Sequence, residues 1–314
     1  MKFPQIDHSE VTGELREIFD DIEATLRLPW VAFACRIMAG FPGALPCAWR
    51  RAQPHFGTRY AEHAADSLRR MAVLPRGNLA DPRPKLRTLN WSDEKIRELI
   101  LVLDAFNYGN VKYLLLITGW AEALQGRHPK GHPLSPEDAA PRPRGLPPGV
   151  PTMHHMVDEN TATAEVSALY ERIKNMHCHH APSSDYRVLA NYPDYLRIAL
   201  DDAIAPVVRT PEYDARQRDL IVEARRWVSG FPGPVGVAPE ELTNTCKPHE
   251  IAGLIGILFM SQRFIADITM DIIRLKQAFD GDAAAMASPF ADSPVAKEHV
   301  AENGGQREGI DGRP

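Results

Sequence analysis

The sequence lacks most of the motifs that identify a cofactor or a familiar catalytic centre. It contains no GxGxxG or GxxxxGK[ST] loop, no GxSxG turn and no HExxH pair. These absences argue against a nucleotide cradle, a hydrolase-type serine nucleophile and a helical zinc-protease site. Only four cysteines occur in 314 residues, and none forms a CxxC pair, so neither a zinc framework nor a redox dithiol is predicted. No cofactor is expected.

Excess positive charge and long uncharged hydrophobic runs are also missing. The chain has 36 Lys and Arg against 41 Asp and Glu, and a net charge of −5 offers no basic field for nucleic acid. The first residues do not form a basic segment followed by an apolar one, and no stretch reaches about 18 uncharged apolar residues. We therefore expect a cytoplasmic protein with neither a nucleic-acid nor a membrane partner.

Apolar residues recur with the spacing of α-helices. Leu15, Ile18, Phe19 and Ile22 follow this spacing, and residues 96–106 repeat it, whereas convincing period-two alternation is absent. With 44% hydrophobic residues the chain can bury a large core. The pattern predicts an all-α fold.

Proline and composition divide the chain. Residues 127–151 hold eight prolines, which cannot continue a helix and indicate a linker. The end of the chain is rich in Ala, Asp, Glu and Gly and has little apolar surface to offset its ordering entropy. We expect helical units at residues 1–126 and 152–281, separated by the linker and followed by a disordered tail at 282–314.

The two helical units are related by an internal repeat. Residues 36–42 (RIMAGFP) match residues 187–193 (RVLANYP) at an offset of 151. Residues 96–126 match 251–281 without a gap at an offset of 155. Such a repeat predicts two tandem copies of one helical unit, packed within the chain as a pseudo-dimer.

The positions where the copies differ are candidates for an asymmetric site. Asp185 falls opposite Ala34, and Asn110 falls opposite Ile265. The same comparison sets Ser184 against Phe33, Lys112 against Asp267 and Tyr113 against Ile268. A polar group that replaces an apolar one in a partly buried place costs stability unless it is paired or used. Asp185 and Asn110 are therefore a candidate catalytic pair.

Each of these features also has a purely structural interpretation. One residue of the Ser183–Ser184–Asp185 segment could cap a helix, and Asn110, close to Gly109, could mark a kink or turn. Trp30 and Phe33 lie one helical turn apart, a spacing that is also typical of core residues.

The histidine-rich segments do not by themselves predict a metal site. His154–His155 and His177–Cys178–His179–His180 place histidines next to one another, and adjacent residues of a helix point in different directions. No carboxylate stands three or four residues from His177, His179 or His180, as in known metal motifs. We predict no metal ligand.

Three segments carry a resemblance to a known family. With LPWVAFACRIMAGFP, FNYGNVKYLLLITGW and APSSDYRVLANYP, the chain resembles the group I 2-haloacid dehalogenases over about residues 10–280. The resemblance implies a cofactor-free enzyme of duplicated all-α fold that hydrolyses short 2-haloacids. It further implies that water, and not an enzyme carboxylate, attacks the substrate Cα with inversion. A homodimer is also implied.

The resemblance assigns roles by position. Asp185 is the expected general base, and Asn110 is expected to orient the attacking water. The expected pocket residues are Trp30, Phe33, Tyr113 and Ser184. Thr58 and Glu62, one helical turn apart, resemble a further polar pair on which activity in the family depends.

Two other classes stay open at this point. An alkylhydroperoxidase-like helical enzyme would need a CxxC pair, and a non-catalytic helical scaffold or binding protein would fit the cap interpretation. The residues that hold the substrate carboxylate are not identified from the sequence. Small side chains at Ser183 and Ser184 favour acceptance of both the D and the L enantiomer.

Overall fold

The protein consists of helices. The computed structural model describes residues 5–290 apart from residues 7, 9, 130, 153 and 154. In these ranges every regular element is a helix, and one isolated β-bridge joins Thr58 to Pro141. The all-α prediction is confirmed. The first half contains α1 (Gly13–Leu26), α2 (Phe33–Met38), α3 (Ala44–Phe56), α4 (Arg59–Met71), α5 (Arg83–Thr88) and α6 (Asp93–Ala123). The second half contains α7 (Ala164–His177), α8 (Ser184–Leu189), α9 (Pro193–Ala199), the π-helix η1 (Leu200–Ile204), α10 (Pro211–Ser229), α11 (Pro239–Leu242) and α12 (Pro248–Met286).

Helix boundaries in the two halves follow the offsets of the sequence repeat. Helices α1 and α7 begin at residues 13 and 164, and α2 and α8 begin at 33 and 184, so both pairs are 151 residues apart. Helices α6 and α12 begin at 93 and 248, which are 155 apart. Both α1 and α7 end at a residue in the left-handed conformation, Arg27 (φ 63) and Cys178 (φ 54).

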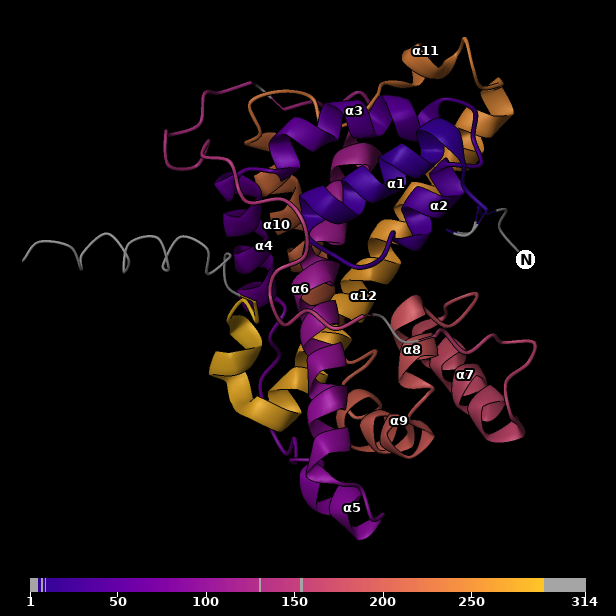
Figure 1. The fold of residues 1–314 in the computed structure, drawn as a ribbon, viewed down its shortest axis with the longest axis vertical. Coiled ribbons are helices and arrows are strands. Elements are labelled where there is room, and N and C mark those ends of the chain that lie inside the picture. Colours follow the sequence, from indigo (N-terminus) through magenta and orange to yellow (C-terminus); the bar gives the residue numbers. More distant parts are fainter. Residues whose placement is uncertain (1–4, 7, 9, 130, 153–154, 291–314) are drawn as a thin grey trace, which may run out of the picture.

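Helices α6 and α12 form the centre of the molecule and share its most extensive helix–helix contact. Figure 1 shows α6 along the long axis, with α1, α2 and α3 gathered near one end and α7, α8 and α9 nearer the other. One core packs α1–α4 and α10 against residues 105–124 of α6, and a second packs α7–α9 against residues 96–106. A site at the junction of these cores can therefore draw side chains from both halves.

The two central helices are the most apolar long helices in the described part of the chain. By length and composition alone, α6 and α12 could each cross a membrane, with window hydropathies of 1.3 and 1.6. Neither helix has 18 successive uncharged residues, because Lys112 and Glu122 interrupt α6 and Arg263 interrupts α12. A helix enclosed by other helices needs apolar residues on all its faces, and 83% of the α6 window is buried.

The proline-rich segment runs across α1 and α4 without forming a helix in its described part. The backbone N–H of Arg142 donates to the carbonyl of Gly57 at 2.7 Å, and that of Gly145 donates to Ala24 at 2.8 Å. The Arg142 side chain is 8% exposed and forms an ion pair with Glu62. The linker therefore contributes a buried charge to the first helical unit.

The predicted tail begins too early. After a break at Gly281 (φ 81), α12 continues to Met286. Ala285 is fully buried, its carbonyl accepts a hydrogen bond from Asn107, and the Phe290 ring lies edge-on to Tyr108 at 5.4 Å. Alanine favours a helix, which continues to Met286, and Ala285 and Phe290 bury their side chains in the core. Residues 291–314 lie outside the described part.

Candidate active site

A cavity of about 530 Å³ lies where the two halves meet. Its walls come from the starts of α2 and α8 and from the middles of α6 and α12. Several lining residues occupy matched positions of the repeat, namely Phe33 with Ser184, Ala34 with Asp185, Arg36 with Arg187, Asn110 with Ile265 and Tyr113 with Ile268. The volume suits a small ligand, and the convergence of both halves makes the cavity the candidate active site.

Asp185 and Asn110 meet at the wall of this cavity. The Asn110 Nδ2 donates to Asp185 Oδ1 at 2.7 Å, and the Ser184 hydroxyl donates to Oδ2 at 3.3 Å. Ser183 accepts from the backbone N–H of Tyr186 and so caps α8. The cap interpretation is therefore correct for Ser183. Asp185 does not cap the helix, and its side chain contacts α6 through Asn110. The predicted convergence of Asp185 and Asn110 is confirmed.

Burial makes Asp185 an unusual carboxyl group. Asp185 is 3% exposed, and this burial raises the pKa of its carboxyl group from the ordinary 3.8 to about 6. The hydrogen bonds from Asn110 and Ser184 act in the opposite direction, whereas the negative charge of Asp271 raises the pKa further. A carboxylate of this basicity, held beside an amide, suits the removal of a proton from water near neutral pH.

The aromatic wall is built around Gly109. A Cβ atom at this position would lie 2.5 Å from the Trp30 ring, so the glycine allows the indole to pack directly on α6. The Tyr113 hydroxyl donates to the Trp30 carbonyl at 2.6 Å. Helix α6 runs without interruption through Asn110, so the kink interpretation was wrong. The cavity lining includes Trp30, Phe33 and Tyr113, as predicted for pocket residues.

Thr58 and Glu62 lie outside the cavity. Thr58 caps α4 by accepting from the backbone N–H of Ala61. The Glu62 carboxylate is 3.1 Å from the Lys112 ammonium and also pairs with Arg142. Although burial raises the pKa of Glu62, Lys112 and Arg142 together hold it below its ordinary value. Lys112 is on α6, two residues from Asn110. The ion pair between Glu62 and Lys112 therefore supports the helix that carries the site.

The sequence reasoning did not identify the basic lining residues. Arg36 and Arg187 line the cavity at matched positions, and Arg187 forms an ion pair with Asp158. Arg36 and Arg187 are the first residues of the matched segments 36–42 and 187–193. Their identity in both segments was the signal in the sequence that could have identified them. His179 also lines the cavity, and its Nε2 is 3.1 Å from Asp267 Oδ2. That pairing joins residues 88 apart in the chain, and local spacing does not predict it.

Comparison with known proteins identifies the family. The family described as "Halocarboxylic acid dehydrogenase DehI" matches residues 29–186. A configuration-inverting 2-haloacid dehalogenase from Alcaligenes xylosoxydans xylosoxydans is 47% identical, over 92% of this chain and 97% of the relative. One from Pseudomonas sp. (strain 113) is 44% identical, over 94% and 97%. The chain belongs to this family of 2-haloacid dehalogenases.

Comparison with solved structures of 2-haloacid dehalogenases agrees with this assignment. A solved structure of a D-2-haloacid dehalogenase mutant with D-2-CPA superimposes with a TM-score of 0.81 at 26% identity, covering 88% of this chain and 96% of the other. The resemblance noted in the sequence is confirmed. The DehI match begins just before Trp30 and ends just after Asp185, so it includes the cavity residues of α2 and α6 and the start of α8 but not those of α12.

Proposed function

We propose that this protein hydrolyses short 2-haloalkanoic acids to 2-hydroxyalkanoic acids and halide, with inversion at Cα. The observation that carries the proposal is the Asp185–Asn110 hydrogen bond of 2.7 Å at the wall of a small, partly apolar cavity. The names of the relatives at 47% and 44% identity support the same reaction and its inversion.

In the proposed step, Asp185 acts as a base. Asn110 offers both a donor and an acceptor and orients a water molecule beside the carboxylate. The water oxygen attacks Cα on the face opposite the halogen, its proton passes to Asp185, and the carbon–halogen electron pair leaves with the halide. One C–O bond forms as one C–X bond breaks, so attack from the opposite face inverts the centre.

The cavity walls suit an anionic substrate with a short chain. Arg36 and Arg187 supply positive charge for the carboxylate, while Trp30, Phe33 and Tyr113 bound an apolar slot. The wall beside the base consists of Ser183 and Ser184, whose small side chains leave space for a substituent in either configuration. We therefore propose that both enantiomers are accepted.

Isotope labelling tests the role of Asp185. A single turnover with excess enzyme in heavy-oxygen water should place the label in the hydroxy acid and none in the Asp185 carboxylate. Label in Asp185 would establish an ester intermediate and overturn the proposed step. Halide release from each enantiomer of 2-chloropropionate, with chiral analysis of the product, tests acceptance of both forms and inversion.

We also propose that the two halves are tandem copies packed as a pseudo-dimer about the cavity. The matched helix starts and matched lining residues support this arrangement. It requires residues 14–126 and 165–281 to superimpose by a near two-fold rotation. The proposed cytoplasmic homodimer can be checked by cell fractionation and by sedimentation of the purified protein.

A further inference from the structure

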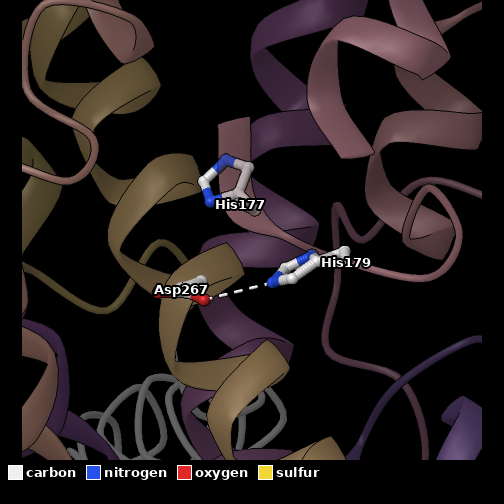
Figure 2. Close-up of side chains that lie close together, drawn as sticks. All are labelled: His177, His179 and Asp267. Carbon is white, nitrogen blue, oxygen red and sulfur yellow. Dashed lines mark hydrogen bonds and ion pairs between the residues drawn. The ribbon is translucent and has the colours of Figure 1, made fainter. Parts of the chain in front are cut away.

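A buried cluster of two histidines and one aspartate lies beside the candidate active site. We name it the His–Asp cluster, and its members are His177, His179 and Asp267. His177 ends α7, His179 follows in the connection to α8, and Asp267 belongs to α12 (Figure 2). Their side chains are 1%, 1% and 4% exposed, and one candidate ligand atom from each lies within 4.8 Å of the others.

Hydrogen bonds satisfy this cluster only in part: Asp267 accepts from Gln217 and pairs with His179, whereas His177 has no such bond. Neither ring nitrogen of His177 has a hydrogen-bond partner of adequate geometry, although Nε2 is 3.0 Å from Asp271 Oδ2. Asp271 is already engaged, since its carboxylate accepts from the hydroxyls of Tyr186 and Tyr213 at 2.7 and 3.1 Å. A buried imidazole that has an ion pair but no hydrogen bond at either nitrogen is incompletely satisfied, so the position of His177 calls for an explanation.

Negative charge at the cluster is also incompletely balanced. Asp267 and Asp271 are 3% and 1% exposed, and in the described part of the chain their only ion pairs are with the two histidines. The Arg274 guanidinium donates instead to the carbonyls of Ala203 and Pro75. The two histidine rings stack at 5.0 Å, so protonating both would place two cations together. A divalent cation would balance both carboxylates while the imidazoles stay neutral.

We propose that His177, His179 and Asp267 bind one divalent transition-metal ion, with zinc as the best match. Two imidazole nitrogens and a carboxylate oxygen suit zinc, whereas calcium and magnesium prefer oxygen ligands alone. With zinc–ligand bonds of about 2.0–2.2 Å, tetrahedral ligand atoms lie about 3.3–3.5 Å apart. The 3.1 Å between His179 Nε2 and Asp267 Oδ2 is therefore close to the required separation.

The ion would fasten the connection between α7 and α8 to α12. This connection leads directly to Asp185, which follows His179 by six residues. When the metal binds, the proton shared by His179 and Asp267 leaves to solvent. The ion has a positioning role in this proposal, and the hydrolytic step does not pass through it.

Metal binding can be measured independently of dehalogenation. The full-length protein is freed of metal with a chelator, titrated with Zn²⁺ against a chromophoric chelator, and analysed for bound zinc. We expect one equivalent per chain and an increase in thermal stability on zinc addition. The visible spectrum of the Co²⁺-loaded protein should show d–d bands that the metal-free protein lacks. Wild-type protein that binds no zinc tightly would overturn the proposal without the use of any variant.

Variants locate the site. His179→Gln and Asp267→Asn should each weaken zinc binding by on the order of 100-fold or more, since even second-shell changes cost 10–100-fold. Circular dichroism checks that each variant keeps its helices. The matched control is Glu23→Gln, because His8, Asp20 and Glu23 form a more exposed cluster of similar donors. Zinc binding that survives both cluster variants, or that is lost in the control, would refute the assignment.

Discussion

Replacing Asp185 by Asn should stabilise the protein while it removes most of the activity. Burial raises the pKa of Asp185 from 3.8 to about 6, a shift of roughly 2 units at about 1.4 kcal/mol each. The ionised carboxylate therefore costs the folded state roughly 3 kcal/mol. Asn carries no charge, and its side-chain oxygen can still accept the hydrogen bond from Asn110. Activity should fall by about 10²–10⁴-fold, the usual contribution of a general base.

The sign of the stability effect follows from proton binding. The folded carboxyl group holds its proton more tightly than the unfolded one, so wild-type stability is lost as the pH rises from about 4 through about 6. The advantage of Asp185→Asn should therefore be close to zero below pH 4 and reach roughly 3 kcal/mol at pH 8. Urea unfolding of both proteins at pH 4, 6 and 8 measures this difference.

An exposed aspartate provides the control. Asp219→Asn on α10 should give no comparable pH-dependent gain, because Asp219 lies at the surface. The reasoning would be refuted if Asp185→Asn were no more stable than wild type at pH 8. A constant gain from pH 4 to pH 8 would refute it as well, since the gain would then not come from ionisation.

Three further predictions concern the site and its support. The value of kcat/KM should fall about tenfold per pH unit below pH about 6, and the residual activity of Asp185→Asn should lack this dependence. Gly109→Ala should lower the free energy of unfolding in urea by about 1–3 kcal/mol, because the new Cβ would lie 2.5 Å from an atom of the Trp30 indole. The control Gly253→Ala places its Cβ in open space and should stabilise the helix. Glu62→Gln should cost about 3–5 kcal/mol, because it removes the carboxylate that pairs with the buried Lys112; a cost within about 1 kcal/mol, as for a surface ion pair, would contradict this.

The fold class and much of the site were accessible from the sequence. Helical periodicity is a local property, and it predicted the all-α class because the buried face of a helix repeats every three to four residues. The offsets of the sequence matches, 151 and 155, also separate the starts of α1 and α7, of α2 and α8, and of α6 and α12. Reading the differences between the copies then identified Asp185 and Asn110, because a buried polar group in only one copy requires a specific reason.

Tertiary structure decided the contacts between distant segments. Glu62 pairs with an arginine 80 residues away, in a segment that the sequence describes only as a linker. His179 pairs with Asp267 across 88 residues, a contact that a rule about spacing along the chain does not test. The pKa of Asp185 likewise depends on which helices enclose it. Periodicity and composition indicate which face of a helix is buried. They do not indicate which other helix packs on that face, and only the tertiary structure shows that α6 packs against α12.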